Sequence, residues 1–366
     1  MTIEDELPAK RAAMPRRSAA VQGSPRAAQT PILTITVNPA LDVTATVPHV
    51  VPTEKLRCST PFYAAGGGGV NVSRAIEALG GTSRAFVALG GATGEHFRQL
   101  LAPHGFDKLI WPIEGETRLS LDLLASSTHQ QYRFLLPGPS QSAAGARALQ
   151  LAARQEIARL PGAFVVISGT LLPGQRTDFV GRLAAEARRS GSRAILDVSG
   201  AALRAAVKVR PFLLRMNHLE AQELLDDPDE PTVLAHRAAQ AIVAQGGAEN
   251  VIVTAGDGGA VLAAGAEMFH FRPPRVEVNS AVGGGDSFTG ALALGLARGL
   301  SLPEACRFGV AAAASAVTGS STELCRGPQT RRFLKQVVSV APPAGFAAQT
   351  PPPARVNQRP GVSSLS

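Results

Sequence analysis

The stretch NSAVGGGDSFTG occupies residues 279–290, and small residues typical of a closely packed helix follow it at 291–298. Successive glycines before a helix let backbone N–H groups approach an anion, and the helix N-terminus adds about half a positive charge. Asp286 stands in the first turn, where its carboxylate can accept the proton of an attacking hydroxyl. The stretch therefore predicts a site for phosphoryl transfer. The alternative is an Asp-capped helix after a flexible loop, which is the commoner explanation of an isolated GGGD motif.

A second glycine-rich stretch, GGGGVNVSRA, lies at residues 66–75 and also opens an amphipathic helix. Four consecutive glycines are costly in backbone entropy, so one turn explains them poorly. We expect the main chain to approach a phosphorylated or polyhydroxylated ligand here, with the Asn71 amide contacting a sugar hydroxyl. A flexible loop is the alternative. Neither cluster is a Walker phosphate loop, because no lysine of the chain follows a glycine in the required spacing.

A third motif, MNHLE, follows the apolar run 212–214 at residues 216–220. Asn217 and Glu220 are three residues apart, and therefore share one face of a helix that begins at the carboxyl end of a strand. Such a pair can orient magnesium-bound water and the phosphates of a nucleotide. The alternative is a helix cap with a solvated acid.

The apolar runs along the chain predict an α/β fold. Residues 32–37 and 85–89 are expected strands, and from about residue 147 helical patterns alternate with apolar runs at 164–167, 194–196, 212–214 and 251–254. This alternation favours a mostly parallel sheet with helices on both faces. Residues 41–63 and 116–136 contain strand-like stretches without a helix between them, so we expect a small separate sheet that acts as a lid or a dimer contact.

Composition excludes several functional classes. Of the formal charge of +8, residues 1–30 and 342–366 each carry +2, and the remaining +4 is too dispersed for a nucleic-acid surface. Three cysteines without paired spacing suggest neither disulfides nor a zinc site. No apolar run approaches the ~20 residues that span a bilayer, so we expect a cytoplasmic protein with no membrane partner. Residues 1–30 and the Pro-rich segment 342–366 are predicted to be disordered extensions.

Seven motifs in order carry a family resemblance: NPALD (38–42), KLR (55–57), GGGGVNVSRA, GGATGE (90–95), SGTLLPG (168–174), NxxE (217–220) and GGGDSFTG (283–290). Together they resemble the ribokinase-like (PfkB-type) carbohydrate kinases, most closely the minor bacterial type of 6-phosphofructokinase. The resemblance spans about residues 32–340, nearly all of the expected kinase domain at 31–341. It implies a three-layer α/β/α fold with a mostly parallel central sheet and a small β-sheet lid.

The resemblance also implies roles for individual residues. Asp286 matches the catalytic base, and the matching anion hole is Gly283, Gly284 and Gly285. Five positions match residues that contact the sugar: Asp42, Gly67, Gly68, Asn71 and Thr170. Three match residues that bind the phosphate group already present on the substrate: Lys55, Arg118 and Arg133. For magnesium the matching pair is Asn217 and Glu220, and the positions lining ATP are Thr254, Gly256, Gly258, Ser280 and Gly285. A monovalent cation such as K⁺ is implied near Ser280, Val282, Ala316 and Gly319.

The chain departs from the family pattern at several positions. Arg215 stands where a nucleotide-contacting lysine is common, Glu323 stands where a basic residue is expected, and Ala281 and Gly284 replace the threonine and alanine that usually precede the catalytic aspartate. The base and the backbone donors are retained. The chemistry implied by the resemblance therefore remains feasible.

The function implied is ATP- and Mg²⁺-dependent transfer of a phosphoryl group to the C1 hydroxyl of fructose 6-phosphate, a step of glycolysis, by a homodimer joined through the lid. Two alternatives keep the mechanism and change the sugar: a tagatose-6-phosphate kinase and a 1-phosphofructokinase. An alternative of another class is a non-catalytic sugar-phosphate sensor. A sensor would be free to lose Asp286, Asn217 and Glu220, all of which this chain retains.

Overall fold

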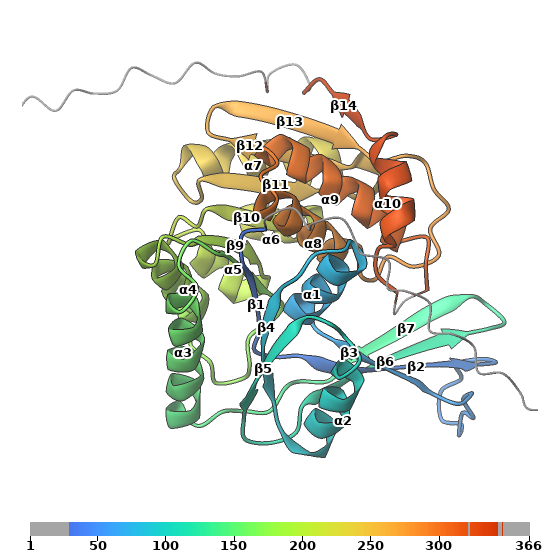
Figure 1. The fold of residues 1–366 in the computed structure, drawn as a ribbon. Helices are drawn as coiled ribbons and strands as arrows, with labels where there is room; N and C mark the ends of the chain where they lie inside the picture. The colour runs from blue at the N-terminus through green and yellow to red at the C-terminus, as the bar shows by residue number, and fades with distance from the viewer. Residues whose placement is uncertain (1–28, 321–322, 343–345, 347–366) are drawn as a thin grey trace, which may run out of the picture.

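The computed structural model describes residues 29–320, 323–342 and 346. Within these residues a large β-sheet is flanked by helices, and a smaller sheet projects from it (Figure 1). The predicted extensions at 1–30 and 342–366 lie almost wholly outside the described residues, so their disorder stays a prediction. No helix in the described part of the chain is long and apolar enough to cross a membrane.

The larger sheet is parallel over most of its width. The strands of its parallel part are, in order, β11 (Asn250–Thr254), β10 (Leu213–Asn217), β9 (Arg193–Asp197), β8 (Phe164–Ser168), β1 (Ile32–Thr36), β4 (Arg84–Leu89) and β5 (Asp107–Pro112). Beyond β11 the sheet continues antiparallel through β12 (Ala260–Ala264), β13 (Glu267–Arg272) and β14 (Val338–Val340). The predicted mostly parallel sheet is confirmed.

Helices cover both faces of this sheet. One face packs against α3 (Ala143–Ala158), α4 (Phe179–Arg189), α5 (Gly200–Ala206), α6 (His218–Leu225) and α7 (Pro231–Ala244). The other packs against α1 (Gly68–Ala78), α8 (Gly284–Ala297), α9 (Leu302–Ala316) and α10 (Gly327–Leu334). Figure 1 shows the two helix groups on opposite sides of the strands. The expected three-layer α/β/α architecture is thus confirmed.

The buried strands follow the apolar runs of the sequence. Every residue of β1 and of β8 is buried, as expected of strands covered on both faces. The runs expected at 85–89, 194–196 and 251–254 likewise lie in strands, and the run at 212–214 overlaps β10, which begins at Leu213. The sequence analysis did not anticipate β5 or the antiparallel strands β12 to β14, which lie toward the two sides of the sheet.

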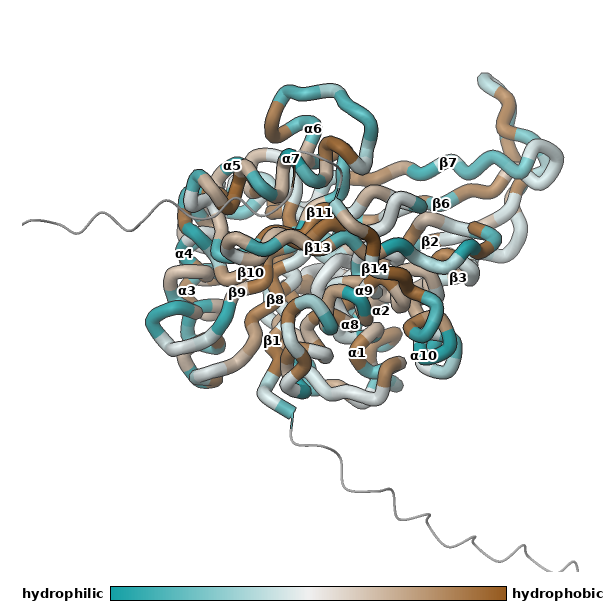
Figure 2. Tube along the Cα trace, turned by 90° about the horizontal axis from the view of Figure 1, so that it is seen from above, coloured by the Kyte–Doolittle hydropathy of each residue, from teal (hydrophilic) through white to brown (hydrophobic). Residues whose placement is uncertain are grey.

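The smaller sheet, called the lid from here on, has the strand order β3 (Phe62–Gly66), β2 (Ala40–Val47), β6 (Arg118–Ala125), β7 (Gln130–Leu135). Strands β2, β6 and β7 come from the two regions predicted to form a separate sheet, whereas β3 begins at the end of the first region and continues beyond it to Gly66. The pairs β2–β3 and β6–β7 are antiparallel, whereas β2 and β6 pair in parallel. Figure 2 shows the lid strands projecting away from the helix-covered body. Helix α2 (Gly91–Leu101) packs against the base of the lid.

Candidate active site

The carboxyl ends of neighbouring parallel strands bring polar side chains to one edge of the large sheet. Ser168 ends β8, Asp197 ends β9, Asn217 ends β10 and Thr254 ends β11. Strand β1 lies between β8 and β4, so the chain leaves β1 toward β4 on one side and later returns to its other side as β8. Open α/β sheets bind ligands at such a switch of direction, outside the carboxyl ends of the strands.

The GGGD stretch forms the cap and first turn of α8, with Asp286 in that turn as expected. Gly283 caps the helix with φ of 77°, in the left-handed region that residues with a Cβ rarely adopt. A Cβ on Gly285 would lie 2.9 Å from Nη1 of Arg215. The first N–H groups of a helix have no partner inside it, so this turn can bind an anion.

The four-glycine run has a cause that the sequence analysis missed. Cβ atoms at these positions would meet the protein itself: at Gly66 the Asp42 carboxylate at 2.0 Å, at Gly68 the hydroxyl of Ser168 at 2.2 Å, and at Gly69 the side chain of Thr36 at 2.5 Å. The glycines therefore let the start of α1 pack tightly against the strand ends and the lid. Close approach of a ligand was the expected reason, and internal structure already explains all four, since Gly67 has φ of 110° and a Cβ there would lie 2.9 Å from Cα of Pro39.

Asn71 and Asp286 connect the two glycine-rich stretches. The Asn71 amide nitrogen donates to Oδ2 of Asp286 at 2.9 Å, across 215 positions of sequence. Burial raises the pKa of Asp286 to about 6, and the nearby Asp197 carboxylate adds to the rise, which Asn71 and Arg215 partly oppose. A carboxylate with a pKa close to neutrality is well suited to accept a proton at physiological pH.

An ion pair that the sequence analysis did not propose lies directly beneath this site. Nη1 of Arg215 is 3.1 Å from Oδ1 of Asp197, and its Nη2 donates to the Thr254 hydroxyl at 2.9 Å. The other Asp197 oxygen accepts from the hydroxyl of Thr289 on α8 at 2.7 Å. This network joins β9, β10 and β11 to the helix that carries Asp286. Asp197 had a usable signal, because it directly follows the apolar run 194–196.

The lid contributes an acid and two arginines near the start of α1. Asp42 on β2 lies over Gly66, and burial raises its pKa to about 6 although Arg118 and Arg133 oppose the rise. Arg118 is half-buried on β6, whereas Arg133 is exposed on β7. The structure therefore brings three of the four predicted lid residues into electrostatic contact. Lys55 lies exposed between β2 and β3, and within the described residues no hydrogen bond or ion pair joins it to them.

Asn38 links two of the predicted substrate residues. Its side-chain nitrogen donates to the hydroxyl of Thr170 at 3.1 Å, and its backbone oxygen accepts from Nε of Arg118 at 3.3 Å. It lies between β1 of the large sheet and β2 of the lid. Asn38 belongs to the NPALD motif, and no role was predicted for it from the sequence.

Asn217 and Glu220 form a capping box at the start of α6. Oδ1 of Asn217 accepts from the Glu220 N–H at 2.9 Å, and Oε2 of Glu220 accepts from the Asn217 N–H at 2.8 Å. Burial raises the pKa of Glu220. The alternative of a simple helix cap is thus correct as a description of the local structure. The capping box uses Oε2 of Glu220, so Oε1 could accept a hydrogen bond from a water bound to a cation.

The remaining predicted nucleotide and cation residues lie in three segments: the turn at 256–258, the loop at 280–282, and the end of α9 with the residues after it. A 3₁₀ turn after β11 begins at Gly256 and ends at Gly258. The buried Ser280 hydroxyl accepts from the Val282 N–H at 3.2 Å, and the Ser280 N–H donates to the Val317 oxygen at 3.3 Å. The segments 279–282 and 316–319 are therefore adjacent, as the predicted cation site at Ser280, Val282, Ala316 and Gly319 requires. Among the described residues, no group of three or more His, Cys, Asp or Glu side chains could by itself hold a metal.

Comparison with known proteins places this architecture in a family. A family model described as pfkB family carbohydrate kinase matches residues 35–329. The chain belongs to the pfkB family of carbohydrate kinases. It is therefore an enzyme of the class that transfers a phosphoryl group to an alcohol.

Individual relatives of this pfkB-family chain are similar over most of their length. An ATP-dependent 6-phosphofructokinase isozyme 2 of Mycobacterium tuberculosis is 39% identical over 316 residues, which are 86% of this chain and 90% of that protein. The crystal structure of phosphofructokinase-2 from Escherichia coli in complex with fructose-6-phosphate has a TM-score of 0.77 and 36% identity, covering 84% of this chain and 99% of that one. A 1-phosphofructokinase of Bacillus subtilis is 29% identical over 309 residues, 84% of this chain and 97% of that protein.

Proposed function

We propose that this chain is an ATP-dependent 6-phosphofructokinase, which transfers the γ-phosphoryl group of ATP to the C1 hydroxyl of fructose 6-phosphate. The observation that carries the proposal is the Asn71–Asp286 hydrogen bond, which holds a partly buried carboxylate between two glycine-rich helix starts. The names of the 6-phosphofructokinase relatives support the same sugar, and the identity to the 1-phosphofructokinase is lower. A non-catalytic sensor is disfavoured, because the acid that performs the chemistry is present.

Asp286 acts as the general base. Its carboxylate accepts the proton of the C1 hydroxyl as that oxygen attacks the γ-phosphorus, and the leaving oxygen departs in line. The raised pKa of about 6 keeps the group ionised at neutral pH while making it a stronger base than an ordinary aspartate. Asn71 holds the carboxylate in place and, through its amide, contacts the sugar.

The N-terminus of α8 stabilises the phosphoryl group during transfer. The backbone N–H groups of Gly284 and Gly285 have no partner within the helix and carry the positive end of its dipole. Gly283 makes the left-handed turn that presents them. Since phosphoryl transfer asks little covalent chemistry of the protein, donors fixed in this way supply much of the rate.

The lid recognises the sugar phosphate. Asp42 contacts the sugar beside Gly67 and Gly68, and Thr170 contacts it from the end of β8. Arg118 and Arg133 bind the 6-phosphate, because guanidinium groups pair with phosphate oxygens in a bidentate manner. Lys55, exposed on its loop, joins them when the lid closes over substrate. An unphosphorylated sugar would leave these positive charges without a partner.

The nucleotide binds along the carboxyl ends of β10 and β11. Residues that would line it are Asn217, Thr254, Gly256, Gly258 and Ser280. The free oxygen of Glu220 fits a water bound to Mg²⁺, and the carbonyl groups around Ser280, Val282, Ala316 and Gly319 fit a K⁺ ion. When bound, the divalent cation neutralises charge on the nucleotide phosphates. Arg215, held by Asp197, supplies a fixed positive charge under the glycine loop.

A panel of sugars tests the proposal. The release of ADP is measured with fructose 6-phosphate, tagatose 6-phosphate, fructose 1-phosphate and fructose. We expect kcat/KM to be highest with fructose 6-phosphate and far lower with fructose. Comparable kcat/KM values for the three phosphosugars would contradict the specificity. Turnover by Asp286→Asn at the wild-type rate would contradict the catalytic assignment.

We further propose that the protein forms a homodimer through the lid. The strand register places Tyr63, Val43, Leu121 and Phe134 in one row across all four lid strands. Tyr63 is 38% exposed and Phe134 is 49% exposed. Such an apolar row across a projecting sheet is typical of a contact surface. A second copy of the lid would cover it symmetrically.

A further inference from the structure

The Asn71 amide lies between Asp286 and an arginine on its own helix. Arg74, one turn along α1, donates from Nη1 to the amide oxygen of Asn71 at 3.1 Å. The amide nitrogen donates to Asp286. The two ends of the amide have the same shape, so their orientation depends on their hydrogen-bond partners. A guanidinium can only donate, and it therefore requires the oxygen on its side and leaves the nitrogen facing Asp286.

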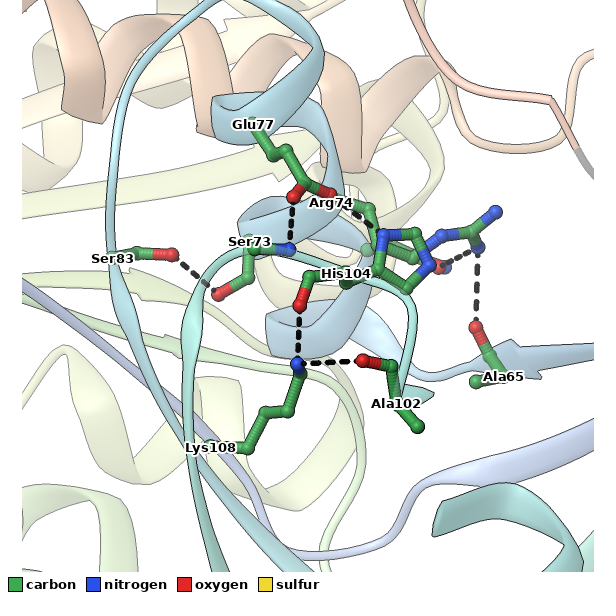
Figure 3. A network of polar contacts seen from close by, with 10 residues as sticks. Ala65, Ser73, Arg74, Glu77, Ser83, Ala102, His104 and Lys108 are labelled. Atoms are coloured by element: carbon green, nitrogen blue, oxygen red, sulfur yellow. Dashed lines mark hydrogen bonds and ion pairs between the residues drawn. The ribbon is translucent and has the colours of Figure 1, made fainter. Parts of the chain in front are cut away.

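Arg74 is held firmly enough to impose this orientation. The same Nη1 donates to the backbone oxygen of Ala65 at 3.1 Å, at the end of β3 (Figure 3). The guanidinium is half-buried between α1 and the lid. One turn further along α1, Glu77 lies 2.6 Å from Nδ1 of His104, and its negative charge also stabilises Arg74 (Figure 3). Arg74 thus connects strand β3 of the lid to the side-chain amide of Asn71 at the start of α1.

The charges around Arg74 are those of the proposed reaction site. Burial lowers the pKa of Arg74, whereas the Asp42, Asp286 and Glu77 carboxylates raise it. Asp286 also interacts electrostatically with Asp197, which raises its pKa, and with Arg215, which lowers it. Arg74 is therefore the positive charge that α1 contributes on the sugar side of Asp286, and it favours the ionised forms of Asp42 and Asp286.

We propose that Arg74 is a positioning residue for phosphoryl transfer, which fixes the Asn71 amide so that its nitrogen, and not its oxygen, meets the Asp286 carboxylate. This inference rests on the proposed roles of Asp286 and Asn71. Without the guanidinium the amide can rotate and place its oxygen against the carboxylate. Two acceptors would then face each other in a partly buried site, and the base would lose its fixed direction.

Steady-state kinetics of Arg74 variants test the role. Arg74→Met keeps the apolar stem and removes the donor, so we expect kcat to fall about tenfold or more. We expect KM for ATP to stay unchanged and the acid limb of the kcat–pH profile to move to higher pH. Arg74→Lys keeps a donor and should recover most of kcat. Arg98→Met is the matched control, because it removes an exposed arginine that pairs with Glu95 on α2, and it should leave kcat unchanged.

A double-mutant cycle separates positioning from general support of the fold. If Arg74 acts through Asn71, adding Arg74→Met to Asn71→Ala causes no further loss of kcat. Additive losses at pH 8, where Asp286 is ionised in every variant, or an Arg74→Met variant with wild-type kcat and pH profile, would overturn the inference. Should circular dichroism show that Arg74→Met does not fold, Arg74→Leu, which also lacks a donor, replaces it: kcat well below that of Arg74→Lys supports the role, and equal values refute it. Asp286→Asn is measured in parallel, since its turnover would refute the proposed function rather than Arg74 alone.

Discussion

Replacing Asp286 by asparagine should stabilise the fold while it stops the reaction. Burial and the neighbouring Asp197 raise the pKa of Asp286 from the ordinary 3.8 to about 6. The native state therefore holds the ionised carboxylate less favourably than the unfolded chain does. Asparagine has the same shape without the charge, and its amide oxygen can still accept the hydrogen bond from Asn71. Removal of the general base should lower kcat by about 10²–10⁴-fold or more.

The size and the pH dependence of the stabilisation follow from this pKa. The rise from 3.8 to about 6 corresponds to at most about 3 kcal/mol of unfolding free energy. Because the native pKa lies above the unfolded one, the native state binds the proton more tightly, and that stability is lost as the pH rises through about 6. The advantage of Asp286→Asn is thus largest at about pH 8 and disappears near pH 4.

Urea unfolding measures this effect through the single tryptophan, Trp111, which lies on β5 and stacks on Phe86. Glu267→Gln is the matched control, because it removes one negative charge from an exposed side chain on β13. We expect that control to change stability by less than about 0.5 kcal/mol. Two results would refute this prediction: an Asp286→Asn variant no more stable than the wild type at pH 8, or a gain in unfolding free energy that is the same at pH 4 and pH 8.

Three further predictions concern the wild-type rate, the lid and the assembly. In the wild type, kcat/KM should fall as the pH drops below about 6, because Asp286 and Asp42 take up protons there; an acid limb near pH 3.8 in the ADP-release assay would contradict this. Arg133→Met should raise KM for fructose 6-phosphate about tenfold with little change in kcat, since one phosphate contact is lost, and an unchanged KM would remove Arg133 from the site. Phe134→Glu should shift the protein from dimer to monomer in sedimentation velocity, because it places a charge in the apolar lid row; a dimer that persists would place the interface elsewhere.

The sequence predicted the parts of the fold that depend on local patterns. The fully buried strands β1 and β8 are continuous apolar runs, and such runs identify central parallel strands without any tertiary information. Strands β13 and β14 were missed because fewer of their residues are buried, so the apolar pattern is weaker there. Strand β12 was missed although its sequence, AVLAA, is a buried apolar run. The parallel pairing of β2 with β6 was also beyond local reasoning, because it joins segments that lie about 80 residues apart.

For the site, residue types were predictable and contacts were not. The GGGD stretch indicated a helix start with an acid in its first turn, and α8 has both. The four-glycine run was explained by a ligand, although Asp42, Ser168 and Thr36 already fill the space beside it. Lys55 was placed at the phosphate from its motif, and its side chain is exposed on the loop between β2 and β3, so its role stays a prediction.

The amino-acid sequence by itself determined the chemistry available to this protein: a carboxylate after a glycine loop, an amide after another, and a sheet whose strand ends collect polar side chains. Only the tertiary structure decided that Asn71 meets Asp286 across 215 residues, that Arg74 orients the amide, and that Asp197 and Arg215 form an ion pair below them. The physical reason is that helix and strand propensities act over a few residues. Contacts between distant segments, and the pKa shifts that these contacts cause, depend on the spatial order of the strands in the sheet.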